Sequence, residues 1–468
     1  KFWNIDVKTR SFTVTYGKCG GNTQSNKKTF TSALAAEAEA KKAVAAKLKA
    51  GYFETTFRPA TPDEQAFEDT LRANPHDFAA WCAYADWLAE RGDPRGEFMQ
   101  TQLALEDESR PKKERNALKK KEAELLVTYE NEWLGPLAEF GVKGGMFDYT
   151  FTRGWLNRVT FGNLAVNQAR ALSRTTSARL LRELVVTDVA YEHPLGRKSP
   201  YIHSHYALGP DVPKGTDYRA ALHPLAKCPH LGGLRLFQFG DGDTALSGHT
   251  NASFDDYSTM NTDTDGAFAL SLVKQMPNLE ELYLFAPEAD AAELFALPAP
   301  KLKVLLLHHA RAYPLGTLAA NPSLTNLAAL LCHPGSIEPD ADGAHIGLAE
   351  LRAVCRSKHL VNLTNLRLRQ TDFGDEGAKE IVASGILKRF KVLDLQGGSI
   401  TDAGAKVLAD APELKALEFL NLRSNALTKA GKDLLKATKV KVDLAEQYNL
   451  ELFDGQGLPG YLYDGDYE

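Results

Sequence analysis

The stretch that decides the fold lies between positions 390 and 425. It contains Phe390-Lys-Val-Leu-Asp-Leu and, 27 positions later, Leu417-Glu-Phe-Leu-Asn-Leu. Both segments fit the pattern L-x-x-L-x-L, and each is followed by a turn and a short helical pattern, which starts at Thr401-Asp-Ala-Gly-Ala-Lys or Thr428-Lys-Ala-Gly-Lys. A strand–turn–helix unit that recurs every 20 to 29 residues, roughly, is typical of a solenoid, in which each unit packs on its neighbours.

The same pattern extends over much of the upstream sequence. Further matches begin at Leu181, Leu231, Leu279, Leu302, Leu324, Leu363 and, weakly, Lys439, and a degenerate unit is expected at 156–161. The spacing and the Gly-Ala-Lys helix starts resemble the ribonuclease-inhibitor-like class of leucine-rich repeats. That resemblance implies an α/β fold: a leucine-rich-repeat solenoid, or horseshoe, over residues 147–450, with parallel strands on the concave side and helices on the convex side.

Strand alternation then predicts which side chains face a partner. In each match, the residue between the last two leucines and the residue two positions later point to the concave side. The protein-binding candidates at these positions are Arg235, Phe237, Tyr283, Phe285, Leu306, His308, Arg367, Arg369 and Arg423; Ala328 and Leu330 take the same positions in the repeat that begins at Leu324. Exposed apolar patches mark interaction sites, and aromatic and arginine anchors suit hot spots. The alternative is that the insertions 190–227 and 240–266 cover this patch.

Residues 1–58 form a separate, basic segment. Nine lysines and two arginines face four acidic residues, a net charge of +7, whereas the whole chain has a net charge of -5. Alternating patterns predict strands at Phe2–Val7, Ser11–Tyr16 and Lys27–Thr31, followed by a helix that Ser32 caps. A basic segment favours an anionic partner, although scattered solvated lysines would give the same count.

The order of these elements, with Tyr16-Gly-Lys-Cys-Gly and the closing Lys49-Ala-Gly-Tyr-Phe-Glu, resembles the WGR domain, a small α+β fold. In some family members the Trp-Gly-Arg motif contacts a DNA end. That implies nucleic-acid contact by Tyr16, Lys18, Lys27 and Lys28, although lysine in place of arginine loses bidentate phosphate binding. A protein-docking or purely structural role is the alternative that the residues favour.

A short helical module separates this segment from the repeats. Residues 64–108 contain two helical patterns and the segment Tyr84-Ala-Asp-Trp-Leu-Ala-Glu-Arg-Gly-Asp-Pro-Arg-Gly-Glu-Phe, which resembles the bacterial repeat-companion domain. Its charged residues between Asp86 and Glu97 favour helix capping and ion pairs over catalysis. A linker helix is expected within 109–146, with Lys112-Lys-Glu-Arg and Lys119-Lys-Lys-Glu on a solvated surface, and residues 451–468 are expected to be an acidic tail or cap.

Several function classes are not supported by the sequence. No G-x-S-x-G, G-x-x-x-x-G-K-[ST] or H-E-x-x-H occurs, and the five cysteines, which are widely spaced, contain no C-x-x-C. We therefore expect no catalytic activity, no cofactor, no metal and no membrane span. The sequence favours a cytoplasmic bacterial adaptor that binds a protein partner, in a signalling or defence assembly, as the regulatory partner or target of a protease. The alternative is a nucleic-acid-binding regulator.

Overall fold

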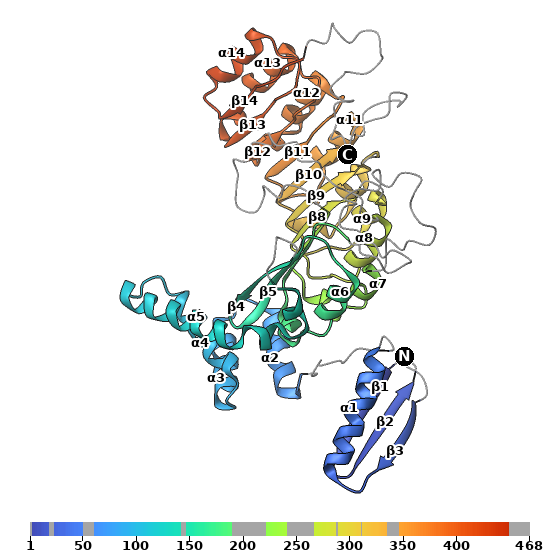
Figure 1. Ribbon diagram of the computed structural model, residues 1–468. Coiled ribbons are helices and arrows are strands. Elements are labelled where there is room, and N and C mark those ends of the chain that lie inside the picture. Colours follow the sequence, from blue (N-terminus) through green and yellow to red (C-terminus); the bar gives the residue numbers. More distant parts are fainter. Residues whose placement is uncertain are drawn as a thin grey trace. The chain divides into compact units, whose positions relative to one another are not determined.

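The chain divides into two compact units in the computed structural model, Lys1–Arg58 and Pro59–Glu468. Figure 1 shows their elements, which we describe for each unit by itself. The structure describes residues 2–17, 23–49, 60–141, 147–189, 221–240, 266–286, 289–309, 311–334 and 346–448. The predicted tail at 451–468 and most of both predicted insertions therefore lie outside the described residues.

The first unit is a three-stranded antiparallel sheet with one helix. Its strands are β1 (Phe2–Lys8), β2 (Ser11–Gly17) and β3 (Thr23–Thr29) in that order, and its helix is α1 (Ala33–Lys49). Phe12 is buried against α1 and lies 5.3 Å from Phe30, measured between ring centroids. The Ser32 hydroxyl accepts a hydrogen bond from the amide of Ala35 at 3.1 Å, as the sequence predicted.

The second unit begins with four helices and one short 3-10 helix. They are α2 (Pro62–Ala73), α3 (Phe78–Glu90), α4 (Pro94–Leu105), α5 (Lys112–Leu134) and η1 (Gly135–Phe140). The side chains of Thr61, Asp77 and Asp93 cap α2, α3 and α4. Asp93 also holds Arg95 through two guanidinium nitrogens, so the predicted role of this charged segment in capping and ion pairing is confirmed.

A long, almost entirely parallel sheet follows. It has 11 described strands: one antiparallel hairpin, β4–β5, and then parallel pairs from β5 to β14 in sequence order. The strands are β4 (Phe147–Thr152), β5 (Trp155–Phe161), β6 (Glu183–Val186), β7 (Leu236–Phe239), β8 (Glu281–Phe285), β9 (Val304–His309), β10 (Ala329–Pro334), β11 (Asn365–Leu368), β12 (Val392–Asp394), β13 (Phe419–Asn421) and β14 (Val442–Asp443). This order is what the repeated strand pattern predicts; the horseshoe curvature stays a prediction.

Helices lie along one side of this sheet (Figure 1). They are α6 (Val166–Leu172), α7 (Leu222–Leu225), α8 (Gly266–Val273), α9 (Ala291–Ala296), α10 (Leu315–Ala320), α11 (Leu348–Cys355), α12 (Gly374–Ser384), α13 (Asp402–Asp410) and α14 (Lys429–Ala437), with 3-10 helices η2 (Thr176–Leu180), η3 (Leu231–Gly233), η4 (Leu324–Asn326), η5 (Ile386–Lys388) and η6 (Pro412–Ala416). Consecutive helices from α9 to α14 contact each other. One continuous apolar core, mostly leucine, fills the space between sheet and helices.

Two repeats have a register that differs from the predicted one. Leu231–Gly233 and Leu324–Asn326 form 3-10 helices, so the strands begin later than their leucines suggest. Phe237 then pairs with Leu184 and Leu282, which are core residues. In the other repeat, Leu330 pairs with Leu305 and Leu366. The expectation that Phe237 and Leu330 face outward is therefore wrong. Closely spaced leucines fit the pattern in more than one way, and pairing with the neighbouring strands decides which register forms.

The segments at the starts of α12, α13 and α14 link one repeat to the next; they read Gly374-Asp-Glu-Gly, Thr401-Asp-Ala-Gly and Thr428-Lys-Ala-Gly. The carboxylate of Asp402 accepts hydrogen bonds from the Thr428 amide (2.9 Å), the Thr428 hydroxyl (2.5 Å) and the Gly431 amide (3.1 Å). Asp375 makes the same three bonds to Thr401 and Gly404. A carboxylate near a helix N-terminus accepts hydrogen bonds from amides that have no partner within the helix. Its negative charge also interacts favourably with the positive end of the helix dipole. The motif therefore stabilises the stack of repeats as well as each helix.

Candidate binding surfaces

The sheet side opposite the helices carries an apolar row in its middle. Tyr283, Phe285, Leu306, Ala329 and Leu331 form a cluster that is separate from the main core. Tyr283, Leu306 and Leu331 are neighbours on paired strands, as the alternation of strand side chains predicts for two of them. The side chains of all five residues in this cluster are nearly inaccessible to solvent, however, at 1 to 7% exposed. The apolar side chains thus gather where the sequence predicted, but they do not form an exposed patch.

Two of the predicted protein-binding residues stabilise the fold and do not face a partner. Phe237 is 0% exposed and belongs to the main core. Arg235 precedes β7 and donates to the Arg72 carbonyl at 2.7 Å and to Glu280 at 3.2 Å, so it fastens α2 to the sheet. The outward position predicted for Arg235 belongs to Gln238, which pairs with Val185 and Tyr283. The alternative match Leu234-x-x-Phe237-x-Phe239 was the signal that could have identified Gln238.

His308 is also buried, at 1% exposed. Burial, reinforced by the neighbouring His309, lowers the pKa of His308 to about 4. The ring is therefore neutral at pH 7, and it lies 5.6 Å from the ring of His333 on the next strand, between centroids. His308 is on the predicted row, but it does not present a charge to solvent.

Beyond the apolar row, the same side of the sheet becomes polar over β11 to β14. Arg369 donates through two nitrogens to Asp394 at 3.1 and 2.8 Å, and both side chains are buried. Arg423 forms an ion pair with Glu446 at the far end. Arg367 lies between Leu331 and Asp394 and is half-buried; burial lowers the pKa of its guanidinium, and Asp394 opposes that shift. We define Arg367, Arg369, Asp394, Arg423 and Glu446 as the polar sector; Arg367, Arg423 and Glu446 are its accessible members.

The described candidates in the first unit, Tyr16, Lys27 and Lys28, are exposed but do not lie together. Tyr16 is 40% exposed, and Lys27 and Lys28 are exposed, whereas Lys18 lies outside the described residues. Lys28 pairs with Phe12 and shares the helix-covered face of the sheet, so Lys27 is on the opposite face. Gln24 pairs with Tyr16, and Lys28 lies four residues further along the same strand, about 13 Å away.

Sequence reasoning missed two residues at the Tyr16 end of the sheet. Trp3 pairs directly with Tyr16, and the Lys47 ammonium lies 5.8 Å from the Trp3 ring centroid. The pattern of β1 and its turn to β2 indicates a hairpin, but the position of Lys47 depends on how α1 packs across the sheet. Tyr16, Trp3 and Lys47 thus form an aromatic and cationic group at one end of the sheet.

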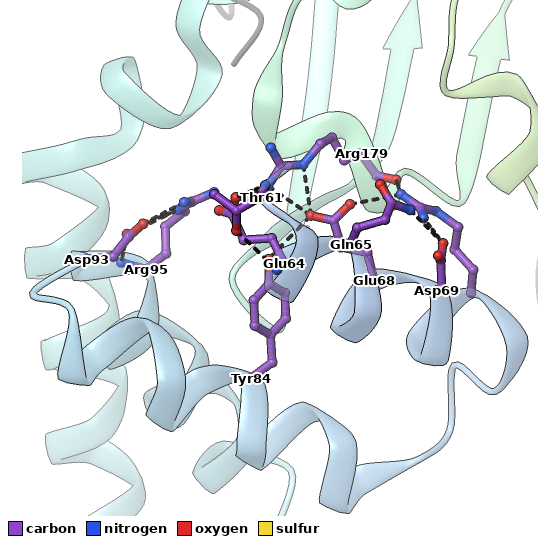
Figure 2. A network of polar contacts seen from close by, with 10 residues as sticks. Thr61, Glu64, Gln65, Glu68, Asp69, Tyr84, Asp93, Arg95 and Arg179 are labelled. Carbon is purple, nitrogen blue, oxygen red and sulfur yellow. Dashed lines mark hydrogen bonds and ion pairs between the residues drawn. The ribbon is translucent and has the colours of Figure 1, made fainter. Parts of the chain in front are cut away.

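A buried polar network joins the helical module to the repeats (Figure 2). Arg179, in η2, donates to Glu68 at 2.8 Å and to Glu64 at 3.4 Å, and the side chains of all three are at most 4% exposed. Tyr84 donates to Glu68 at 3.3 Å, and Arg72 also pairs with Glu68 at 2.9 Å. Burial raises the pKa of Glu68, while Arg179 and Arg72 oppose that shift. Because these groups contact one another and are shielded from solvent, we interpret the network as a structural joint.

The described residues offer little for other chemistry. They contain no group of three His, Cys, Asp or Glu side chains that could hold a metal ion. Burial raises the pKa of the thiols of Cys228, Cys332 and Cys355, which keeps them protonated. Within the same part of the chain, no helix combines the length and the apolar character needed to cross a membrane.

Comparisons with known proteins identify two of these parts. Residues 1–58 match the WGR domain, and residues 359–382 and 390–409 match a leucine-rich repeat, so the chain contains both. No curated protein matches the chain. Among solved structures, it is similar to a Bacteroides fragilis protein (16% identity, TM-score 0.42, covering 96% of this chain and 93% of that one). It is also similar to an internalin from Listeria monocytogenes (13% identity, TM-score 0.29, covering 63% and 82%). The repeat-companion resemblance stays a prediction.

Proposed function

We propose that this protein is a non-enzymatic adaptor that binds a protein partner through the polar sector of its leucine-rich repeats. The observation that carries the proposal is the position of Arg367. It is the half-buried cation where the apolar row meets the buried Arg369–Asp394 pair. Arginine held in this way against partly desolvated surroundings is typical of residues that dominate binding energy in interfaces. We place this activity in the bacterial cytoplasm, in a signalling or defence assembly, as a protease's regulatory partner or target, by analogy with the architecture alone.

The buried state of the apolar row decides which substitutions can test this proposal. Tyr283 and Phe285 are 3% and 1% exposed, so replacing them removes packing and confounds binding with stability. Arg367 and Arg423 are more accessible and lie on the same side of the sheet. A variant with Arg367→Ala and Arg423→Ala therefore changes the surface and leaves the apolar core in place.

The experiment is affinity capture of partners by the full chain from the native host, quantified by mass spectrometry. We expect the double arginine variant to lose a partner that the wild type captures, by at least about tenfold, the loss expected from about 1.4 kcal/mol of binding energy. A matched control, Lys406→Ala with Lys429→Ala, changes two exposed cations on the helix side and should keep the partner. Equal capture by all three proteins would exclude the polar sector as the binding surface.

A second candidate function is nucleic-acid binding by the WGR domain. The observation that favours it is the group of Tyr16, Trp3 and Lys47. The exposed Tyr16 ring can stack on a base, and Lys47, which lies over the neighbouring Trp3 ring, can attract a phosphate. A salt-sensitive complex of the full chain with DNA or RNA, weakened by Tyr16→Ala or by Lys18→Ala, would support this candidate.

A further inference from the structure

The first three turns of α5 carry an unusual concentration of cations. Between Lys112 and Lys121 the helix has five lysines and one arginine against a single acidic residue, Glu114. With 3.6 residues per turn, Lys112, Lys113, Arg115, Lys119 and Lys120 fall within an arc of roughly 160° on one side of the helix. Glu114 and Lys121 fall outside this arc. We call these five residues the basic side of α5.

The rest of the module lies against the other side of α5. Lys121 pairs with Glu97 of α4 at 2.7 Å, and the Gln102 amide donates to Glu122 at 2.8 Å. Leu125 is buried, and it projects in the same direction as these two contacts. The basic side therefore faces away from α4, and its four lysines are exposed.

Most of the charge on the basic side is not neutralised. Lys120 has one acidic partner, Glu124, at 3.7 Å, in a pair whose side chains are 80% and 65% exposed and which is therefore weak. Across the parts of the chain that the structure describes, no ion pair includes Lys112, Lys113 or Lys119. The sequence alone favoured a solvated surface for these residues. The structure adds that the four lysines are exposed along one side of the helix, whereas Arg115 on the same side is half-buried.

We infer that the basic side of α5 binds the phosphate backbone of a nucleic acid. The five cations lie within about 12 Å of helix rise, and duplex DNA carries about one negative charge per 1.7 Å of its axis, so several phosphates lie within reach of this side. Exposed lysines act as point charges, which suits contact with the backbone and not with particular bases. This surface is separate from the polar sector and from the Tyr16 group, and the inference does not depend on either proposed function.

A membrane surface is the less suitable partner for this charge. A helix that binds a membrane interface inserts an apolar side beneath its basic side. In α5 the apolar side chain that projects away from the basic side, Leu125, is already buried within the protein, where it packs with Phe98 of α4. The basic side itself has no large apolar residue between Lys112 and Lys120.

The test measures binding of the full chain to labelled DNA and RNA by fluorescence anisotropy. Two unrelated sequences of each are titrated between about 50 and about 200 mM salt, where backbone contacts dominate the salt dependence. The test variant is Lys112→Glu, Lys113→Glu and Lys119→Glu. The matched control is Lys358→Glu, Lys388→Glu and Lys415→Glu, which makes the same charge change at three exposed lysines elsewhere in the repeats. A third arm, Tyr16→Ala with Lys27→Ala, measures the contribution of the WGR domain.

We expect the α5 variant to bind every sequence more weakly and to reduce the slope of log K against log salt by about 2 to 3, since each lost phosphate contact contributes about 0.9. Its circular dichroism should match the wild type, because all three lysines are exposed. The inference is overturned if the wild type binds no nucleic acid at the lowest salt, if the control variant weakens binding as much as the α5 variant, or if only the Tyr16 variant weakens it.

Discussion

A single side chain in this protein takes its role from the register of its strand. Phe237 and Gln238 are neighbours in sequence, yet Phe237 packs in the core and Gln238 takes the outward position between Val185 and Tyr283. A shift of one residue exchanges the two roles, because successive side chains of a strand point to opposite faces. An aromatic residue within a repeat is therefore no guide to a binding surface until the hydrogen-bonded partners of its strand are known.

The first prediction concerns the assignment of Phe237 to the core. Phe237→Ala should lower the free energy of unfolding by about 3 to 5 kcal/mol, because it removes a fully buried ring and leaves a cavity. Phe78→Ala is the matched control: that ring is 50% exposed, so its loss should cost less than about 1 kcal/mol. Urea denaturation monitored by circular dichroism measures both values. A small cost for Phe237→Ala would place this ring on the surface.

At the level of elements, the helices on one side of the sheet are linked by carboxylates. Asp402, in the first turn of α13, accepts the hydrogen bonds of Thr428 and Gly431 at the start of α14. The same link joins Asp375 of α12 to Gly404 of α13. A Cβ atom on Gly431 would lie 2.2 Å from the nearer oxygen of Asp402, and one on Gly404 would lie 2.4 Å from Asp375. Glycine at this position of the motif thus follows from the close approach of the preceding repeat.

The second prediction tests this link. Gly431→Ala should destabilise the protein by about 1 to 3 kcal/mol, because the new methyl group displaces the Asp402 carboxylate and breaks the hydrogen bonds that cap α14. Combining Gly431→Ala with Asp402→Ala should cost less than the sum of the single variants, since both break the same link. A double-variant cycle measured by chemical denaturation gives this coupling.

Gly316 supplies the control for this prediction. It lies within α10, its amide donates to Glu350, and a Cβ added there would meet nothing closer than 4.0 Å. Gly316→Ala should be neutral or stabilising by up to about 1 kcal/mol, because alanine favours the helix. If Gly431→Ala behaves like Gly316→Ala, the carboxylate link does not constrain the motif.

At the largest scale, the helical module and the repeats belong to one compact unit, Pro59–Glu468. Arg179 of the first repeats holds Glu64 and Glu68 of α2, and the three side chains are almost completely buried (Figure 2). A buried ion pair contributes little net stability, but loss of one partner leaves an uncompensated charge. The module and the repeats should therefore unfold together.

The third prediction follows from this joint. Arg179→Met should lower the free energy of unfolding by about 3 to 5 kcal/mol, because Glu64 and Glu68 lose a buried cation. Lys406→Met, which breaks the exposed pair with Asp410, should cost less than about 1 kcal/mol. Chemical denaturation followed by tryptophan fluorescence and circular dichroism should show the module and the repeats unfolding in one transition, whether or not the Lys1–Arg58 unit unfolds separately. Two separated transitions within Pro59–Glu468 of the wild type would show that the module folds apart from the repeats.

The candidate surfaces could be predicted only in part at this scale. The sequence indicated the side of the sheet and the positions of Tyr283, Leu306 and Arg367, because strand alternation is local. It did not indicate that the apolar row is buried or that Arg369 and Arg423 are held in ion pairs, because those properties depend on residues 23 to 25 positions away. The group of Trp3 and Lys47 beside Tyr16 required the packing of α1 on the sheet for the same reason.

The sequence by itself determined that the chain contains a basic N-terminal unit, a capped helical module and a repeated strand–helix array. Leucine spacing, cap residues and Gly-Ala-Lys starts are local signals, and they act through backbone hydrogen bonds and side-chain periodicity. The tertiary structure alone decided the register of the strands that contain Phe237 and Leu330, the burial of the apolar row and the joint at Arg179. Each of these depends on contacts between distant residues, and several placements of leucine satisfy the local pattern equally well until neighbouring strands select one.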